Sequence, residues 1–301
     1  MSAVNGQVSK MDRASHLRSN QTTLDQLWAK AKIVHFSDGR LAVSIDATEL
    51  HFLSATQIEA LIKSGEFKAG EKYFLGLDQL DSEPYFAWNS DHPKSQSDEA
   101  PAGYATLREI GGDLDELQME LALHSVALSN WHNTHPHCAR CGAQTSVAMG
   151  GAVRTCDADK SEHYPRTDCA VIVLVRDADD RILLGRQAIW PEGRFSCFAG
   201  FLEPGETFEQ CVQREVYEES GVAVREINYL GSQPWPFPAS IMISFEAITD
   251  FPEVARPDGE EIVEIKWLSR TELKTQVADG SLSMPPAMSV SRKMIDRWLH
   301  A

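Results

Sequence analysis

A helix that carries glutamates on its apolar side is the feature that most restricts how this chain can fold. Thr207 and Gln210 form a capping-box signature and Gly221 is a natural C-terminal stop, so the sequence predicts a helix over 208–220. At about 100° per residue, the inward stripe that begins at Phe208 also contains acids, while the opposite side is already polar. The acids on the inward stripe are Glu215, Glu218 and Glu219.

Carboxylates this close together repel one another unless a cation lies among them. Hard divalent cations such as Mg²⁺ or Mn²⁺ meet this need, because they prefer carboxylate oxygen and keep positions open for phosphate. Arg214, next to Glu215, can offset one charge and orient a carboxylate. The sequence therefore predicts a Mg²⁺ or Mn²⁺ site on this helix.

The spacing around the helix resembles a known family signature. Gly200, Glu206 and the run 214–222 match the full box of the Nudix hydrolases. The resemblance implies an α/β fold, an α/β/α sandwich with a mixed sheet, and metal-dependent hydrolysis of a nucleotide pyrophosphate by water. It also implies a metal ligand in the backbone carbonyl of Ala199 and a further acid shortly before a Trp, for which Glu261 is the candidate beside its neighbours Glu260 and Glu264.

A proline-rich segment narrows the substrate. Residues 232–240 resemble the array that marks the NADH pyrophosphatase branch of the Nudix family, and their alternating prolines present two aromatic rings on a stiff backbone. Without the resemblance, a loop packed for structure would be the preferred interpretation. The substrate-binding candidates in the array are Ser232, Gln233, Trp235, Phe237 and Ser240. By the same resemblance, Tyr164 and Phe201 form the pair that stacks on the adenine ring.

The resemblance implies cleavage of NADH or NAD⁺ to AMP and NMNH or NMN, by a homodimer. The family also removes NAD caps from RNA 5′ ends, so NAD-capped RNA is a second candidate substrate. One alternative is a Nudix hydrolase of another nucleoside diphosphate such as ADP-ribose. An alternative from a different class is a non-catalytic regulatory protein that binds zinc and nucleotide.

Three of the six cysteines form a cluster with the spacing C-x2-C-x14-C. Cys138, Cys141 and Cys156 resemble a zinc ribbon, in which thiolates bind a structural Zn²⁺ tetrahedrally; the alternative is a ribbon that packing holds together without zinc. A fourth cysteine would be expected at position 159, where this chain has Asp159. His163 is the preferred fourth ligand, since His is the commoner zinc ligand, and Asp159 is the alternative.

The 301 residues allow more than one domain, and the formal charge of −16 argues against a broad basic surface for nucleic acid or anionic membrane. No apolar segment is long enough to span a bilayer, and the polar N-terminus lacks a secretory signal, so we expect a soluble cytoplasmic protein.

We predict an N-terminal mixed α/β domain at 1–132, a zinc-ribbon segment at 133–165 and a Nudix domain at 166–301. Outside helix 208–220, the pattern predicts helices at 113–131 and 290–299, strands at 72–77, 85–88, 169–175, 181–184, 241–248 and 262–268, and a linker at 89–103.

Overall fold

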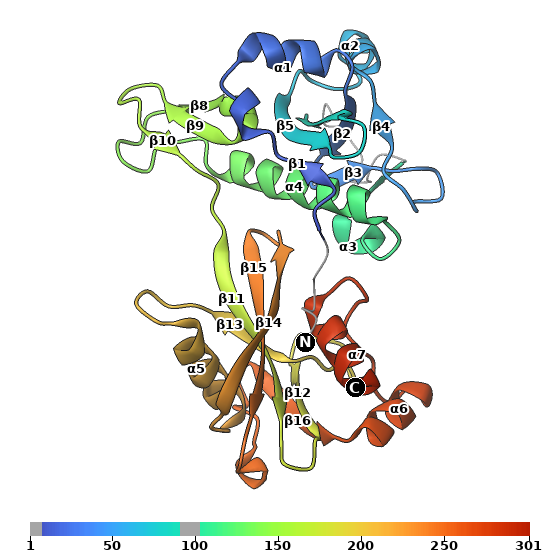
Figure 1. Ribbon diagram of the computed structural model, residues 1–301, viewed down its shortest axis with the longest axis vertical. Helices are drawn as coiled ribbons and strands as arrows, with labels where there is room; N and C mark the ends of the chain where they lie inside the picture. The colour runs from blue at the N-terminus through green and yellow to red at the C-terminus, as the bar shows by residue number, and fades with distance from the viewer. Residues whose placement is uncertain (1–7, 91–102) are drawn as a thin grey trace. The chain divides into compact units, whose positions relative to one another are not determined.

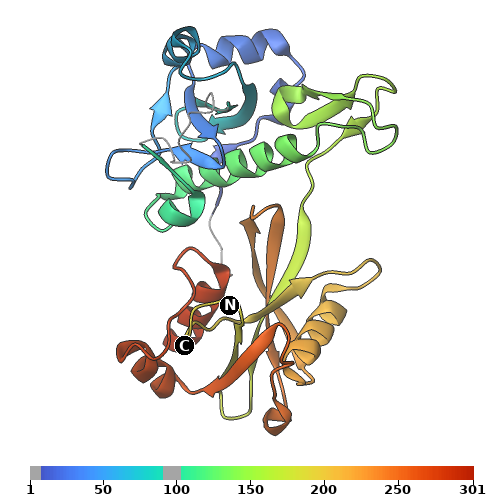
Figure 2. The same ribbon diagram turned by 180° about the vertical axis from the view of Figure 1, so that it is seen from behind.

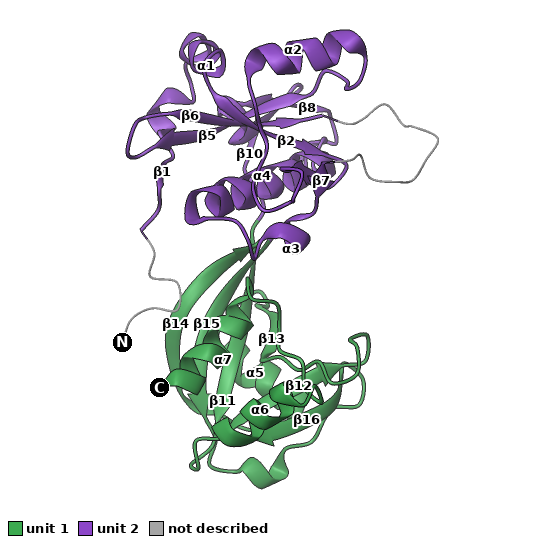
Figure 3. Cartoon of the chain, turned by 90° about the vertical axis from the view of Figure 1, so that its right-hand side faces the viewer, with its two compact units in different colours: residues 1–7, 167–235, 240–301 green, residues 8–166, 236–239 purple. Residues whose placement is uncertain are grey.

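The computed structural model describes residues 8–90 and 103–301, which divide into two compact units (Figure 3). Unit 1 contains residues 167–235 and 240–301, and unit 2 contains residues 8–166 together with the four residues Pro236–Ala239. The cysteine cluster therefore belongs to the same unit as the N-terminal domain. The predicted linker at 89–103 lies almost entirely outside the described residues.

A mixed six-stranded sheet forms the centre of unit 1, with the order β14-β15-β11-β12-β16 and β13 paired to β11. Strand β11 runs parallel to β15 and antiparallel to β12 and β13. All four strands predicted in this part of the chain are confirmed. The strands are β11 (Asp168–Arg176), β12 (Ile182–Gln187), β13 (Phe198–Phe201), β14 (Arg225–Trp235), β15 (Ser240–Ile248) and β16 (Ile262–Leu268).

Helices cover both faces of this sheet (Figures 1 and 2). Alternate residues of β11 point to opposite faces, so Val171 and Val173 pack in the core with α5 (Phe208–Ser220). Ile172 and Leu174 pack on the other face against α6 (Arg270–Ala278) and α7 (Val290–His300). The predicted α/β/α sandwich is therefore confirmed.

Helix α5 begins and ends where its sequence signals predict. The Thr207 side chain accepts a hydrogen bond from the backbone N–H of Gln210, and the Gln210 side chain accepts one from the backbone N–H of Thr207. Gly221 ends the helix in the left-handed conformation, with φ of 70°. This local chemistry fixes the phase of the helix and hence the direction of each glutamate.

The N-terminal part of unit 2 is built on a second, seven-stranded mixed sheet with the order β1-β5-β6-β2-β3-β7 and β4 paired to β2. The predicted strands at 72–77 and 85–88 are confirmed as β5 and β6, and the predicted helix at 113–131 is α4. The strands are β1 (Met11–Asp12), β2 (Lys32–Ser37), β3 (Arg40–Ala42), β4 (Phe52–Leu53), β5 (Glu71–Asp78), β6 (Pro84–Asn89) and β7 (Tyr104–Ala105). The helices are α1 (Gln21–Trp28), α2 (Ala55–Ser64), α3 (Leu107–Ile110) and α4 (Glu116–Thr134).

A small antiparallel sheet carries the cysteine cluster: β8 (Thr145–Ala148), β9 (Val153–Cys156) and β10 (Glu162–His163). Buried Arg154 of β9 donates to the Thr145 carbonyl at 2.8 Å and to Nδ1 of His132 on α4 at 2.9 Å. Burial lowers the pKa of His132 to about 4, so the ring is neutral and can accept this bond. The polar network joins the small sheet to α4.

None of the helices in residues 8–90 and 103–301 has the length and apolar character needed to cross a membrane.

Candidate active site

A deeply buried carboxylate of unit 1 lies on the inner side of α5. Glu219 is only 4% exposed, and its Oε2 atom has no hydrogen-bond partner among the described residues. The backbone N–H of Ala199 on β13 donates to the same carboxylate. Burial, together with the charges of Glu261 and Glu215, raises the pKa of Glu219 to about 9. A bound cation would supply the partner that this carboxylate lacks.

Glu215 lies beside Glu219 and packs directly against the backbone of β13. Its side chain is 13% exposed, and burial raises its pKa. A Cβ atom added to Gly200 would lie 1.9 Å from the Glu215 Cδ atom, well inside van der Waals contact. Only glycine at position 200 therefore leaves room for this carboxylate.

Arg214 joins the acids of α5 to the loop that precedes the helix. Its Nε and Nη2 atoms donate to the two carboxylate oxygens of Glu206, at 2.6 and 2.8 Å. Its Nη1 atom donates to Glu215 at 2.8 Å and to Glu218 at 3.1 Å. These hydrogen bonds hold the pKa of Glu206 at about 2. The predicted pairing of Arg214 with Glu215 is confirmed, and Arg214 compensates part of the charge of three glutamates.

The prediction that Glu218 points inward is wrong, since its side chain is 56% exposed. Glu218 lies roughly 80° around the helix from Phe208, at the edge of the apolar stripe, where the sheet no longer covers the helix. Its link to the site runs through Arg214. Of the three glutamates on the predicted stripe, two are therefore enclosed and one faces solvent.

Of the neighbouring acids Glu260, Glu261 and Glu264, Glu261 is the one whose charge acts on the two enclosed carboxylates of α5. It lies just before β16, and its negative charge raises the pKa of both Glu219 and Glu215. The Nε2 atom of Gln187 donates to its Oε1 atom at 2.6 Å. Glu264 instead forms an ion pair with an arginine, Arg186, at 3.2 Å. Glu215, Glu219 and Glu261 together offer only oxygen donors, a set that fits a hard divalent cation.

The proline-rich array forms the end of a hairpin between β14 and β15. Trp235 pairs with Ser240 where the two strands end, and Pro236–Ala239 form the tip. Gln233 is buried, and its amide donates to the Met288 carbonyl at 2.7 Å and accepts from the Val290 N–H at 2.6 Å. Gln233 therefore holds the start of α7, and its contact with a nucleotide stays a prediction.

The two rings proposed to stack on adenine belong to different units. Phe201 ends β13 next to Gly200 and is 57% exposed. Tyr164 is 65% exposed, and its hydroxyl donates to Glu162 at 2.6 Å. Each ring offers a free face, and their joint stacking on one base stays a prediction, as does the role of the Ala199 carbonyl as a metal ligand.

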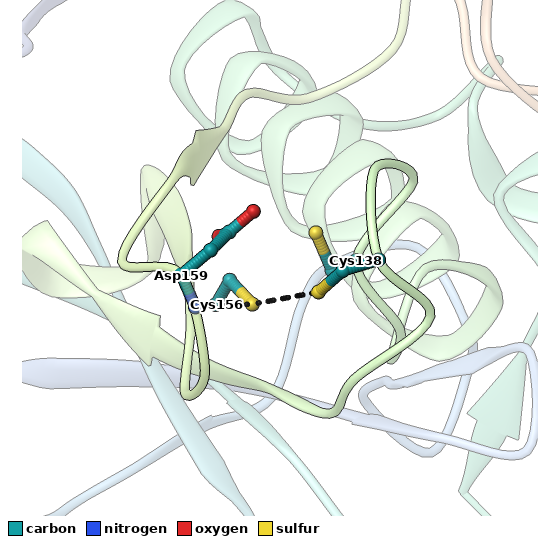
Figure 4. A group of neighbouring side chains, drawn as sticks. Cys138, Cys156 and Asp159 are labelled. Atoms are coloured by element: carbon teal, nitrogen blue, oxygen red, sulfur yellow. Dashed lines mark hydrogen bonds between the residues drawn. The ribbon is translucent and has the colours of Figure 1, made fainter.

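The cysteine cluster brings four side chains together, as Figure 4 shows for three of them. Ligand atoms of Cys138, Cys141, Cys156 and Asp159 all lie within 4.8 Å of one another. His163 is not in this group, and its Nε2 atom lies 3.3 Å from the Ser161 hydroxyl. The structure therefore brings Asp159, the alternative candidate, into the cluster, and the preferred candidate His163 lies outside it. The turn after β9 explains the difference, because the Asp159 N–H bonds to the Cys156 sulfur at 3.4 Å and directs the chain back toward the thiols.

Three residues of this site were not among the site residues predicted from the sequence. Glu206 belongs to the family box, and its spacing from Arg214 was the available signal. Gln187 and Asp258 had no such signal: the former binds Glu261, and the charge of the latter contributes to the raised pKa of Glu219. Gln187 reaches the site through the pairing of β12 with β16. Asp258 lies in the segment before β16, where its Oδ1 atom accepts from the Ile262 N–H at 2.9 Å.

Comparison with known proteins gives one match over the part of the chain that holds the glutamates and others over nearly the whole chain. The family model described as NUDIX domain matches residues 166–288. The NAD-capped RNA hydrolase NudC of Mycobacterium tuberculosis (strain ATCC 25618 / H37Rv) is 35% identical over 295 residues, which cover 95% of this chain and 92% of that protein. The human NAD-capped RNA hydrolase NUDT12 is 35% identical over 198 residues, covering 62% of this chain and 43% of that protein. A crystal structure of a NUDIX hydrolase from Nitrosomonas europaea aligns with a TM-score of 0.43 and 22% identity, over 55% of this chain and 90% of that one.

Proposed function

This chain belongs to the Nudix hydrolase family, and we propose that it cuts the pyrophosphate bond of NAD(H), giving AMP and NMN or NMNH. Support for the substrate comes from 35% identity to NAD-capped RNA hydrolases over nearly the full length of both chains. The observation that carries the reaction type is the buried Oε2 atom of Glu219, which has no hydrogen-bond partner among the described residues and feels the charges of Glu215 and Glu261. NAD-capped RNA is a second substrate that the same chemistry would serve.

In this proposal the carboxylates of Glu215, Glu219 and Glu261 hold Mg²⁺ or Mn²⁺. When bound, the cation supplies neutralisation of the phosphate oxygens and activation of water for attack. Without a cation, Glu219 would hold a proton on its carboxylate, because its pKa is raised to about 9. Arg214 keeps Glu215 oriented and offsets its charge, so that the carboxylate stays available as a ligand despite its burial.

The substrate-side residues are proposals that rest on the family resemblance. Ser232, Trp235 and Ser240 lie on the strand ends next to the tip of the hairpin, and Phe237 lies in the tip itself. The exposed rings of Phe201 and Tyr164 supply stacking faces for a base. A homodimer and a cytoplasmic location complete the proposal, and a cysteine cluster arranged for a metal ion and not for disulfides fits a reducing compartment.

The test is chromatography of the products after the protein meets NADH, NAD⁺, ADP-ribose and NAD-capped RNA separately, each with Mg²⁺, with Mn²⁺ and with EDTA. We expect AMP plus NMNH from NADH only when a divalent cation is present. Cleavage of ADP-ribose without cleavage of NADH or NAD⁺ would favour the alternative substrate. Nucleotide binding without turnover in either metal would instead favour the regulatory protein.

We also propose that Cys138, Cys141, Cys156 and Asp159 hold a structural Zn²⁺, because three thiolates and a carboxylate converge there. The purified protein should contain about one zinc per chain by elemental analysis. Asp159→Ala should weaken zinc binding at least about tenfold in a competition with a chelator. His163→Ala is the matched control and should retain zinc. Loss of zinc from His163→Ala with retention in Asp159→Ala would contradict the assignment of the fourth ligand.

A further inference from the structure

Two residues of the N-terminal domain hold the tip of the hairpin that carries the substrate array. We propose that Asn130 and Arg108 are positioning residues for recognition of the nicotinamide nucleotide. The inference rests on the proposed function and extends it, because it gives the N-terminal domain a part in substrate selection. The tip, Pro236–Ala239, is grouped with this domain in unit 2 (Figure 3).

Asn130 supplies hydrogen bonds that the tip cannot make for itself. Pro236 and Pro238 have no N–H, so the four-residue tip contains only two backbone donors. The Nδ2 atom of Asn130 donates to the Pro236 carbonyl at 3.0 Å and to the Pro238 carbonyl at 3.1 Å. One amide group thus fixes two carbonyls on either side of Phe237.

Arg108 fixes the ring between those carbonyls. Its guanidinium carbon lies 4.0 Å from the centroid of the Phe237 ring, a cation–π contact. The supporting helix α3 is itself held by the capping box of Thr106 and Glu109 and by its buried side chains. Asn130 has an equally firm support, since its neighbours Leu128 and Trp131 on α4 are buried.

The tip is continuous along the chain with the strand ends that carry the rest of the substrate array. Trp235 and Ser240 immediately flank the tip and pair with each other, and Ser232 lies three residues further along β14. The catalytic carboxylates, in contrast, lie on α5 and beside β16. A shift of the tip should therefore disturb substrate recognition more than metal binding, and a displacement of about 1 Å can cost roughly 10²-fold in rate.

The sharpest variant is Asn130→Asp, which keeps the shape of the side chain but replaces the donor by an acceptor facing two carbonyls. Asn133→Asp is the matched control on the same helix, because Asn133 uses its Oδ1 atom as an acceptor from Asn89 and aspartate preserves that bond. Steady-state kinetics with NADH and with ADP-ribose should be measured for both variants, together with thermal melting. Binding of NADH to the metal-free protein, followed by its fluorescence, gives a readout independent of turnover.

We expect Asn130→Asp to lower kcat/KM for NADH by about 10- to 100-fold, mainly through KM, and to weaken binding of NADH by a similar factor. The preference for NADH over ADP-ribose should shrink, while Asn133→Asp stays within about twofold of the wild type. Arg108→Gln should act in the same direction and Arg108→Lys should recover part of the loss, because lysine keeps the cation. Arg40→Gln, which removes a partly buried arginine paired with Glu109, is the second control.

An Asn130→Asp protein that is folded and keeps both its affinity for NADH and its substrate preference would overturn the inference. An equal loss on both substrates, with a lowered melting temperature, would also overturn it, because that result indicates a general structural role. Failure of the wild-type protein to cleave any nicotinamide substrate would count against the proposed function instead. The binding measurement would then still test whether Asn130 positions the hairpin.

Discussion

Glu219→Gln should lower NADH turnover by about 10³-fold and leave the fold intact, because it removes the carboxylate that we propose as the central metal ligand. The amide has the shape of the carboxylate and can still accept the Ala199 N–H. Turnover is measured at saturating Mg²⁺ and Mn²⁺, and metal affinity by calorimetry. Glu209→Gln is the control, since Glu209 lies in the first turn of the same helix on its exposed side. Retained turnover in Glu219→Gln would contradict the role of this helix in metal binding.

The same substitution should change how the stability of the metal-free protein depends on pH. Glu219 has a folded pKa of about 9, raised from an ordinary value of 4.5. Between these values the folded protein holds a proton that the unfolded chain has released, so stability falls as pH rises through this window. Glu219→Gln cannot titrate there, and its melting temperature should exceed that of the wild type increasingly from pH 5 to pH 9.

Divalent cation should reverse this order. Mg²⁺ or Mn²⁺ replaces the proton on Glu219, so it should bind the wild type more tightly as pH rises and raise its melting temperature. The variant should gain little from either ion. Parallel pH profiles for the two proteins without metal would contradict the assignment of the buried proton to Glu219.

Gly200→Ala should reduce turnover by roughly 10²-fold with little loss of stability. The new methyl group would lie 1.9 Å from the Glu215 Cδ atom, so the carboxylate must move away from β13. The end of a glutamate side chain can rotate aside, which spares the fold, but it then leaves the position beside Glu219. Turnover and the melting temperature should be measured together.

Gly112→Ala is the matched control for this substitution, because a Cβ atom there meets nothing within 4 Å and its φ is not positive. Metal affinity measured on both variants shows whether a loss of activity comes from a displaced Glu215 carboxylate or from a general effect on the fold. If Gly200→Ala binds Mg²⁺ and turns over substrate like the wild type, the close packing of Glu215 on β13 has no catalytic importance. A large fall in its melting temperature would indicate that the backbone, not the carboxylate, yields.

The sequence by itself determined the helix that carries the glutamates, and it indicated the reaction class. The capping box at Thr207, the stop at Gly221 and the spacing of Glu215 and Glu219 are short-range signals, and the structure confirms each of them. Short-range signals are reliable here because capping and helix periodicity depend on residues only three or four positions apart. The strands of unit 1 followed from apolar runs for the same reason.

Only the tertiary structure decided which side chains meet across long separations. In the structure, Glu261 is the one of three neighbouring acids whose charge raises the pKa of Glu219. The Glu218 side chain faces solvent, and Asp159, not His163, lies beside the thiols. The tertiary structure also joined Asn130 to a tip more than a hundred residues away. Sheet pairing and turn geometry bring these groups together. Sheet pairing and turn geometry produce no periodic pattern in the sequence, because each contact depends on where another part of the chain lies.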